Sequence, residues 1–389
     1  MITFENAVRE SMPKALAGLP TLSVALLDYP DELDLKNRAF ALFCENNGLP
    51  VPEKVVESPM PRNYRTTTKR RAGFEDGRFS LFFGADERLE YVEPLEPAEH
   101  LAIYRLVEEL LRKNVFAVLA DAMNWVIVRG SYRKRAVIFN VCEMNAAVVR
   151  KLKLMGEHLN ASGLGIVSAH VYFDPTRSDY YLEALRPTNT LAFKTLYGPK
   201  DLTLDLGTFR LKYPVTGFSQ INESQIPNLL FYAKKMLNPT PRESMLDLYC
   251  GYGLFSFGMG ESAASTWGAE WEGPSIECAR NSARFLKRKA KFLAGKIDGN
   301  FVEKSIPESS CPELILLDPP RAGVEPGVIE ALARRKPERV LHIFCGTDEI
   351  PRSLNKWRLS GYRARQIRPL DLFPGTPHLE TLVLLESGR

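Results

Sequence analysis

The sequence predicts a C-terminal Rossmann-like domain of the α/β class, with a doubly wound and mostly parallel sheet, preceded by an N-terminal α+β domain. After about residue 200, strand-like and helix-like patterns alternate along the chain, which is typical of a parallel sheet covered by helices. Before that point, short strand-like runs lie around two longer helical segments. That arrangement favours a mostly antiparallel sheet.

The composition is that of an ordinary globular protein. The 389 residues are 45% hydrophobic and 25% charged, which suffices for a large core and two domains. Six scattered cysteines form no Cys-x-x-Cys pair, which argues against a zinc or iron–sulfur site and fits a reducing cytoplasm. The first residues resemble no targeting peptide, and no apolar stretch is long enough to cross a membrane. We expect a monomer without an obligate protein partner.

The first part of the chain divides into two segments. Residues 1–57 are expected to form a helical extension, because residues 34–46 have helical apolar spacing and end at an Asn-Gly-Leu-Pro turn. Residues 58–200 are expected to form an α+β domain that contacts the substrate. Its expected helices span 97–114 and 146–162, and its expected strands span 78–84, 124–129, 136–142, 166–173 and 180–185.

A basic segment at the start of this α+β domain is a candidate for RNA contact. Residues 62–71 hold five cations and a tyrosine, and residues 132–135 add a second basic cluster. Cations can neutralise phosphates and an aromatic ring can stack on a base, although a solvated strand or loop has the same composition. The net charge of +4 permits a nucleic-acid partner without demanding one. The candidate RNA-binding residues are Arg62, Tyr64, Arg65, Lys69, Arg70 and Arg71.

The third segment, residues 201–389, carries the alternating pattern. Four of its chemically useful side chains lie where expected strands end, and in doubly wound sheets ligands bind beyond the carboxyl ends of strands. These side chains are Tyr249, Glu270, Asp318 and Cys345. The expected helices span 225–237 and 274–290, and the expected strands span 244–249, 265–270, 313–318, 339–345, 362–369 and 379–386.

A glycine turn after the first of these strands predicts a nucleotide cofactor. Gly251 and Gly253 allow a sharp turn with close backbone approach to a ligand. Glu270 ends the next strand about twenty residues later, where a carboxylate can accept hydrogen bonds from ribose hydroxyls. A dinucleotide or S-adenosylmethionine fits this pattern. The Asp318-Pro319-Pro320-Arg321 turn favours the methyl donor, since dehydrogenases have no need of it.

These motifs together resemble the TrmA/RumA family of RNA uracil-C5 methyltransferases, from about Tyr213 to Leu385. Residues 247–253 are similar to the family's first cofactor motif, and residues 317–323 match its Asp-Pro-Pro-Arg-x-Gly motif. Residues 373–380, Phe-Pro-Gly-Thr-Pro-His-Leu-Glu, match its C-terminal motif, and residues 218–222 resemble its Phe-x-Gln-x-Asn segment.

The resemblance implies a reaction and a role for each matching residue. Cys345 would be the nucleophile that adds to C6 of uracil, and Glu380 would be the base that removes the C5 proton. A helix expected at residues 348–356 would favour the thiolate through its dipole. Phe218 and Arg321 are assigned to the RNA. Contacts to S-adenosylmethionine or the target base are implied for Gln220, Tyr249, Gly251, Gly253, Glu270 and Asp318.

The chain also departs from the family pattern. The family has Ser-Cys-Asn-Pro around its nucleophile, whereas this chain has Phe-Cys-Gly-Thr at residues 344–347. An OB-like RNA-binding domain and a cysteine cluster are not apparent, which weakly favours tRNA over rRNA as the substrate. Two alternatives stay open: a methyltransferase acting on a nucleobase nitrogen of RNA, and a catalytically silent RNA-binding protein on the same fold.

Overall fold

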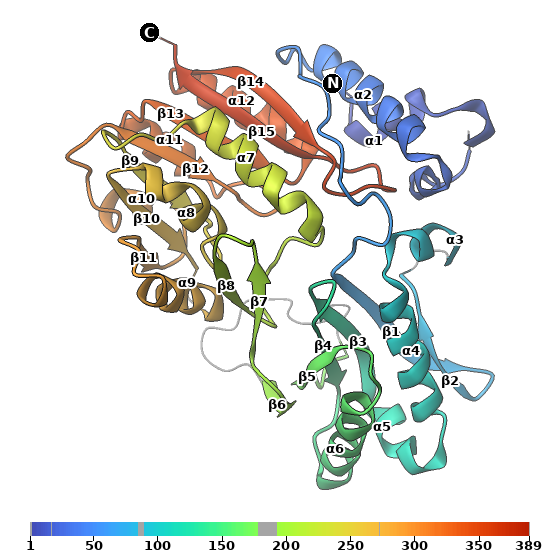
Figure 1. The fold of residues 1–389 in the computed structure, drawn as a ribbon. Coiled ribbons are helices and arrows are strands. Elements are labelled where there is room, and N and C mark those ends of the chain that lie inside the picture. The colour runs from blue at the N-terminus through green and yellow to red at the C-terminus, as the bar shows by residue number, and fades with distance from the viewer. Residues whose placement is uncertain (1, 17, 85–88, 178–192, 272, 389) are drawn as a thin grey trace. The chain divides into compact units, whose positions relative to one another are not determined.

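The computed structural model describes residues 2–16, 18–84, 89–177, 193–271 and 273–388, which divide into two compact units (Figure 1). We call Met1–Pro61, Leu206–Lys212 and Ser224–Arg389 the Rossmann-like unit. Arg62–Asp205 and Tyr213–Glu223 form the α+β unit. The N-terminal helices, expected as a separate extension, therefore belong to the same compact unit as the C-terminal half of the chain.

The Rossmann-like unit is built on a seven-stranded sheet with the order β11-β10-β9-β12-β13-β15-β14. The first five strands in this order are parallel, and β15 runs antiparallel to both of its neighbours. The predicted doubly wound, mostly parallel sheet is thus confirmed. The strands are β9 (Ser244–Leu248), β10 (Ser265–Glu270), β11 (Lys291–Ala294), β12 (Glu313–Leu317), β13 (Arg339–Phe344), β14 (Tyr362–Leu370) and β15 (Glu380–Ser387).

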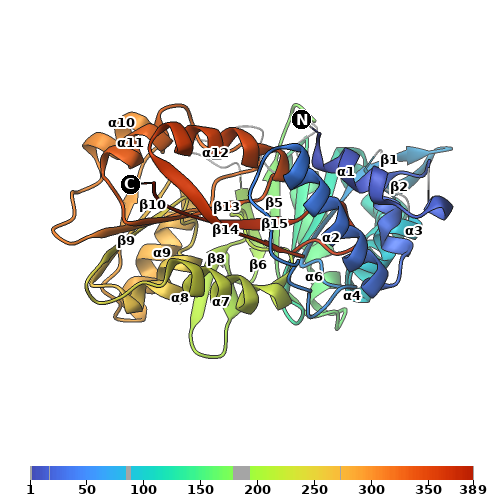
Figure 2. The same cartoon turned by 90° about the horizontal axis from the view of Figure 1, so that it is seen from above.

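Helices cover both faces of this sheet, as the view in Figure 2 shows. Because β9, β12 and β13 are buried on both faces, their residues are apolar almost throughout and alternate between two clusters of buried side chains. One cluster includes residues of α11 (Val328–Arg334) and α12 (Ile350–Leu359), and the other includes residues of α7 (Ile226–Leu237) and α8 (Leu254–Met259). Two further helices of this unit are α9 (Pro274–Phe285) and α10 (Gly299–Lys304).

The N-terminal helices α1 (Phe4–Ser11) and α2 (Tyr29–Asn46) extend the first of these clusters. Phe4 packs edge-to-face on Phe40 and Phe43, and all three are buried in the cluster that contains Phe344 of β13. The segment that follows α2 runs beside β14, where the Val56 N–H bonds to the Pro369 carbonyl at 2.9 Å. This shared core explains why the N-terminal segment does not form a unit of its own.

The α+β unit contains a six-stranded sheet with the order β2-β1-β3-β4-β5-β6. Only the β4–β5 pair is parallel, so the expected mostly antiparallel sheet is present. The strands are β1 (Thr67–Glu75), β2 (Arg78–Phe82), β3 (Met123–Gly130), β4 (Arg135–Val141), β5 (Ile166–Phe173) and β6 (Phe193–Tyr197), with helices α3 (Leu89–Val92), α4 (Ala98–Leu111), α5 (Ala117–Ala122) and α6 (Ala146–Asn160). Strands β7 (Asp201–Asp205) and β8 (Arg210–Pro214) form a further two-stranded sheet.

Each predicted strand within the described residues matches an observed strand to within two residues at each end. The strand expected at 180–185 lies outside the described residues. Helix α9 ends at Phe285 instead of residue 290, because Lys287 adopts a φ of +53° and the chain turns. That turn allows the short edge strand β11, which the sequence pattern did not indicate. Within the described ranges, no helix is both long and apolar enough to cross a membrane.

Candidate active site

The chain leaves the end of β9 through a tight turn in the left-handed region of backbone conformation. Tyr249, Gly251 and Gly253 have φ values of +63°, +55° and +90°. Glycine adopts such values without steric cost, whereas tyrosine is strained there by about 1–2 kcal/mol. A Cβ atom at Gly253 would lie 2.6 Å from the Phe257 ring, so glycine is also needed for space. Backbone strain of this kind gathers at ligand-binding turns.

Glu270 ends β10 and closes this turn. Its Oε2 atom accepts the Gly251 N–H at 2.9 Å, and its Oε1 atom accepts the Trp271 N–H at 2.7 Å. The structure therefore brings the glycine turn and the Glu270 carboxylate together.

The carboxyl groups of Asp247, Asp318 and Glu380 also lie at this edge of the sheet. Asp247 is buried, accepts the Ser256 hydroxyl at 2.5 Å through Oδ2, and has a pKa raised to about 7 by burial and by the charge of Glu270. Burial and the charges of Glu380, Asp247 and Glu270 raise the pKa of Asp318 well above its usual range. Mutually repelling carboxyl groups favour a bound cation. A sulfonium or an ammonium group suits this edge.

Cys345 and Glu380 are brought together by antiparallel pairing. Strand β13 ends at Phe344, which pairs with Thr381 of β15, so Cys345 and Glu380 are the next residues at that end of the ladder. The thiol of Cys345 donates a hydrogen bond to the Glu380 carboxylate. The Oε2 atom of Glu380 has no hydrogen-bond partner among the described residues. The predicted nucleophile and base are therefore neighbours.

The electrostatics of this pair are dominated by burial. Burial and the charge of Glu380 raise the pKa of the Cys345 thiol to about 12, against the opposing effect of Arg321. Burial raises the pKa of Glu380 to about 7, although the thiol hydrogen bond and Arg321 lower it. The Arg321 guanidinium also lies 5.9 Å from the centre of the Phe373 ring. The pair is thus placed beside a cation on the Asp-Pro-Pro-Arg turn.

The contribution of a helix dipole to this thiol stays a prediction. A 3-10 turn at Thr347–Glu349 leads into α12, so a helix does begin just after Cys345. Burial and the charges of Glu380 and Asp318 raise the pKa of the thiol, and Arg321 opposes them. The sulfur is therefore expected to keep its proton in the free protein.

Gly346 explains one departure from the family pattern. Its φ of −112° is available to any residue, so conformational freedom is not the reason for glycine. A Cβ atom at this position would lie 2.7 Å from the carbonyl oxygen of Arg321. The loop after Cys345 therefore passes directly over the backbone of the Asp318–Arg321 turn. The sequence alone could not reveal this close approach, because it joins two segments that are far apart in the chain.

The candidate RNA-binding residues of the α+β unit differ in exposure. Lys69 and Arg71 are exposed and lie 5.7 and 5.6 Å from the centre of the Trp125 ring, whereas Arg62 and Arg65 are partly exposed. Tyr64 is fully buried. Arg70 is 3% exposed and forms two hydrogen bonds with Glu96, at 2.6 and 3.0 Å. Burial therefore corrects the prediction and removes Tyr64 and Arg70 from the RNA-contacting candidates.

Two other predicted residues lie in the segment Tyr213–Glu223 of the α+β unit. Phe218 is 61% exposed, as a ring that stacks on a base requires. Gln220 is buried, and its main-chain carbonyl accepts the Thr66 hydroxyl at 3.3 Å. Both residues keep their proposed roles as predictions.

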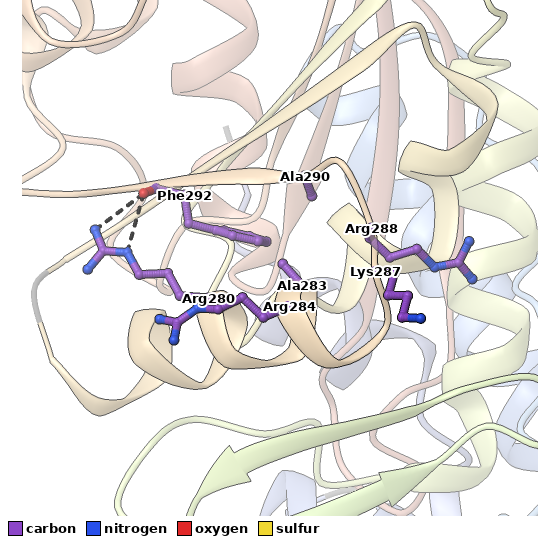
Figure 3. A pocket seen from close by; sticks show the side chains of 7 residues that line it. All are labelled: Arg280, Ala283, Arg284, Lys287, Arg288, Ala290 and Phe292. Atoms are coloured by element: carbon purple, nitrogen blue, oxygen red, sulfur yellow. Dashed lines mark hydrogen bonds between the residues drawn. The ribbon is translucent and has the colours of Figure 1, made fainter.

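Cys250 and a cavity beside α9 lie outside the Cys345–Glu380 pair. Cys250 is buried in the glycine turn, and burial and neighbouring carboxyl groups raise its pKa well above its usual range. A cavity of about 340 Å³ beside α9 and β11 contains none of the predicted site residues. Figure 3 shows that its cationic side chains diverge, with Arg280 and Arg284 on one side and Lys287 and Arg288 on the other. They do not converge on one ligand.

The order of the strands, the antiparallel β15 and the site beyond the carboxyl ends of β9, β10 and β12 define the fold of a class I methyltransferase. Residues 305–388 match the sequence model of the tRNA (Uracil-5-)-methyltransferase family. This match includes Asp318, Arg321, Cys345 and Glu380.

Individual proteins agree with the family match. An uncharacterized RNA methyltransferase of Clostridium acetobutylicum is 30% identical over 49% of this chain and 42% of its own length. A 23S rRNA (uracil(1939)-C(5))-methyltransferase of Marinomonas is 31% identical over 48% of this chain and 42% of its own length. This chain therefore spans about two fifths of these relatives.

A solved structure extends the comparison to nearly the whole fold. The tRNA (uracil-54, C5)-methyltransferase of Pyrococcus abyssi, solved with S-adenosyl-L-homocysteine, has a TM-score of 0.68, with 20% identity over 94% of this chain and 85% of that one. At that identity the likeness shows the fold. Together these comparisons confirm the resemblance to the RNA uracil-C5 methyltransferases that the sequence indicated.

Proposed function

We propose that this protein is an S-adenosylmethionine-dependent RNA methyltransferase that acts on C5 of uridine through a covalent cysteine adduct. The observation that carries the proposal is the contact between Cys345 and Glu380 beside the Asp318–Arg321 turn. A nucleophilic thiol beside the base has no use in transfer to a nucleobase nitrogen, because a nitrogen lone pair can attack the donor without covalent activation of the ring.

The sheet edge fits the methyl donor. S-adenosylmethionine supplies an electrophilic methyl group on a positively charged sulfur when it is bound. Glu270 offers two acceptor oxygens for the ribose hydroxyls, and the strained turn at Tyr249–Gly253 allows close backbone approach. Asp318, whose pKa is raised by its acidic neighbours, gains from the positive charge of this donor. The buried Oδ1 atom of Asp247 has no partner among the described residues, which leaves an acceptor at the same edge.

Cys345 performs the first covalent step. C5 of uracil is a weak nucleophile, and addition of the Cys345 sulfur to C6 moves electron density onto C5. The thiol must lose its proton as the C6–S bond forms. Glu380 is the described group that already accepts a hydrogen bond from this thiol, and its pKa of about 7 lets it take and release a proton near neutral pH.

Glu380 also serves the last step. After methyl transfer, C5 carries both the new methyl group and its original proton. Removal of that proton by Glu380 returns the electron pair to the C5–C6 bond, and the C6–S bond breaks with release of Cys345. The free Oε2 atom of Glu380 gives the carboxylate an available acceptor for this proton.

The RNA substrate would be recognised outside this catalytic pair. Lys69 and Arg71 present charge beside an aromatic ring, and Phe218 presents an exposed platform. A uridine inside folded RNA would be flipped out at a cost of a few kcal/mol. We keep tRNA as the weakly favoured substrate, with rRNA as the alternative. A cytoplasmic, monomeric protein stays a prediction.

The decisive experiment uses RNA containing 5-fluorouridine. Fluorine at C5 cannot be removed as a proton, so an adduct formed through Cys345 is trapped after methyl transfer. We expect a covalent RNA–protein band on denaturing gels for wild-type protein with S-adenosylmethionine, using transcripts of tRNA and of 23S rRNA fragments. Cys345→Ala should form none, and Cys311→Ala, which changes a cysteine outside the site, should behave like wild type. Methyl transfer that survives Cys345→Ala would instead support a nucleobase-nitrogen methyltransferase.

A further inference from the structure

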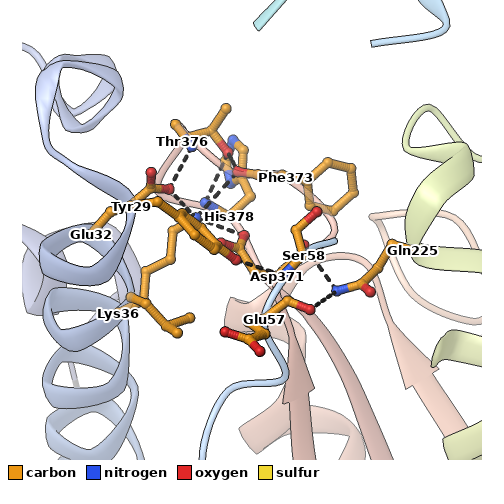
Figure 4. A network of polar contacts seen from close by, with 12 residues as sticks. Tyr29, Glu32, Lys36, Glu57, Ser58, Gln225, Asp371, Phe373, Thr376 and His378 are labelled. Atoms are coloured by element: carbon orange, nitrogen blue, oxygen red, sulfur yellow. Dashed lines mark hydrogen bonds and ion pairs between the residues drawn. The ribbon is translucent and has the colours of Figure 1, made fainter. Parts of the chain in front are cut away.

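A lysine of the N-terminal helix α2 is completely buried against the segment that leads to Glu380. The Lys36 ammonium has no exposed surface and lies 2.8 Å from Glu32 Oε1 and 2.7 Å from Asp371 Oδ1. It also donates to the carbonyl oxygen of Phe373 at 3.3 Å. Figure 4 shows these side chains facing one another between α2 and the loop after β14.

Lys36 and its partners hold the first half of this loop. Asp371 is the first residue after β14, and its N–H bonds to the Val56 carbonyl at 2.9 Å. Glu32 accepts the Gly375 N–H at 2.5 Å. The Thr376 hydroxyl donates to the Phe373 carbonyl at 2.8 Å. These contacts hold residues 371–376, and the His378 N–H continues them by bonding to the Thr376 hydroxyl at 3.3 Å, two residues before Glu380.

A second contact of the N-terminal segment reaches the loop that carries the nucleophile. The Phe4 N–H at the start of α1 bonds to Asp348 Oδ1 at 2.7 Å. Asp348 follows Cys345 by three residues. The N-terminal helices therefore bind the loop of the nucleophile and the loop of the base, and the buried Phe4–Phe40–Phe43 cluster joins these two contacts.

Burial of three charged groups is a costly way to stabilise a fold. Apolar side chains of similar volume are often as stabilising as a buried ion pair, so such a pair is weak evidence for a purely structural role. A buried ion pair does fix geometry, because its oxygen atoms and N–H groups must lie within hydrogen-bond distance of one another. The segment fixed here is the loop that leads to Glu380.

We propose that Lys36 is a positioning residue for catalysis, which fixes the loop 371–379 through Glu32 and Asp371 and so holds the Glu380 carboxylate at Cys345. This inference rests on the proposed function, because it assumes that Glu380 removes the C5 proton. It assigns to the N-terminal helices a role in the last step of the reaction, the step in which the C5–H and C6–S bonds break.

The test compares the two steps in which Glu380 accepts a proton. We expect Lys36→Met to slow formation of the trapped adduct with 5-fluorouridine RNA by about tenfold, because the displaced Glu380 accepts the Cys345 proton less well. The last step should slow more, because no group other than Glu380 is proposed to take the C5 proton. With unmodified RNA, the same variant should accumulate a methylated RNA–protein adduct and lose kcat by about 100-fold, as expected for a base displaced by about 1 Å. Glu380→Gln is the reference for this accumulation. Arg38→Met, an exposed change on the same helix, should match wild type.

A second variant tests whether the effect of Lys36→Met comes from an unpaired buried charge that unfolds the protein. Lys36→Met with Asp371→Asn removes one positive and one negative charge together, so the cluster keeps its formal charge. It should also accumulate the adduct on unmodified RNA if the loop is displaced. Loss of kcat in proportion to the unfolded fraction in thermal melts, without adduct on unmodified RNA, would overturn the proposal. Absence of any adduct in wild type with 5-fluorouridine RNA would instead overturn the proposed function.

Discussion

The Cys345 thiol donates a hydrogen bond to the Glu380 carboxylate at the end of the β13–β15 pair. Burial raises the pKa of the thiol to about 12 and that of Glu380 to about 7, so the resting proton stays on sulfur. The proton must therefore leave the sulfur as the C6–S bond forms, and Glu380 is the neighbouring carboxylate that can accept it. One carboxylate thus controls the start and the end of the proposed reaction.

The role of Glu380 as a proton acceptor predicts how turnover depends on pH. Glu380 must be deprotonated to accept a proton, and its pKa is raised to about 7, so kcat should rise about tenfold per pH unit below 7 and level off above it. Rates of methyl transfer from labelled S-adenosylmethionine between pH 5.5 and 9 would measure this. A flat profile from pH 5.5 to 8 would exclude Glu380 as the base, provided that the protein is folded throughout.

The same raised pKa predicts a stability effect of the opposite sign. Glu380 binds its proton more tightly in the folded protein than in the unfolded chain, so its contribution to stability is full below about pH 4.5 and is lost as the pH rises to about 7. Glu380→Gln should therefore raise the free energy of unfolding by about 1–3 kcal/mol at pH 8. Urea unfolding at pH 8 and at pH 4.5 would test this, with little difference between variant and wild type at the lower pH.

The close approach at Gly346 makes another prediction. Gly346→Ala would place a Cβ atom 2.7 Å from the Arg321 carbonyl oxygen, so the Cys345 loop or the Asp318–Arg321 turn must move. We expect adduct formation with 5-fluorouridine RNA to slow by about 10- to 100-fold. Gly48→Ala is a control for lost stability alone, because its φ of +63° strains an alanine at a turn outside the site and its Cβ atom would meet nothing within 4 Å. An unchanged adduct rate in Gly346→Ala would show that the loop can shift without cost.

Much of this site could be predicted from strand ends. Glu270, Asp318 and Cys345 follow apolar runs, and parallel strands bring their carboxyl ends to one edge. The pairing of Cys345 with Glu380 depends on the register of β13 and β15, which no local pattern states. The burial of Lys36 could not be predicted from the sequence for a related reason. It lies four residues after Glu32 on a helix, which resembles a surface ion pair, and its burial depends on a loop more than 300 residues away.

The prediction that Arg70 contacts RNA failed for a simpler reason. Successive residues of a strand point to opposite faces, so Lys69 and Arg71 cannot lie on the same face as Arg70. Composition alone treated all three as equivalent. Once β1 is placed, its alternation separates the exposed cations from the buried one, and that signal was available in the sequence.

The acidic edge predicts selective binding of a cationic donor. The pKa of Asp318 is raised by burial and by Glu380, Asp247 and Glu270, so the positive sulfonium of S-adenosylmethionine should be bound better than the neutral sulfur of S-adenosylhomocysteine. Asp318→Asn should reduce this preference by about tenfold, a change of about 1.4 kcal/mol in relative affinity. Calorimetric titration of both ligands would measure it, with Glu277→Gln on α9 as the control. Equal losses for both ligands would indicate a neutral hydrogen-bonding role.

The exposed and buried cations of β1 predict different responses to salt. Each cation that neutralises a phosphate contributes about 0.7–0.9 to the slope of log affinity against log salt concentration. Lys69→Gln and Arg71→Gln should each weaken RNA binding and lower this slope, because both side chains are exposed beside Trp125. Arg70→Gln should leave the slope unchanged and reduce thermal stability instead, because it removes one partner of the buried pair with Glu96. Filter binding of tRNA transcripts at 50–300 mM salt, with thermal melts of each variant, gives both quantities. A reduced slope in Arg70→Gln at full folding would return Arg70 to the RNA-contacting residues, and unchanged slopes in the other two would place the RNA on a different surface.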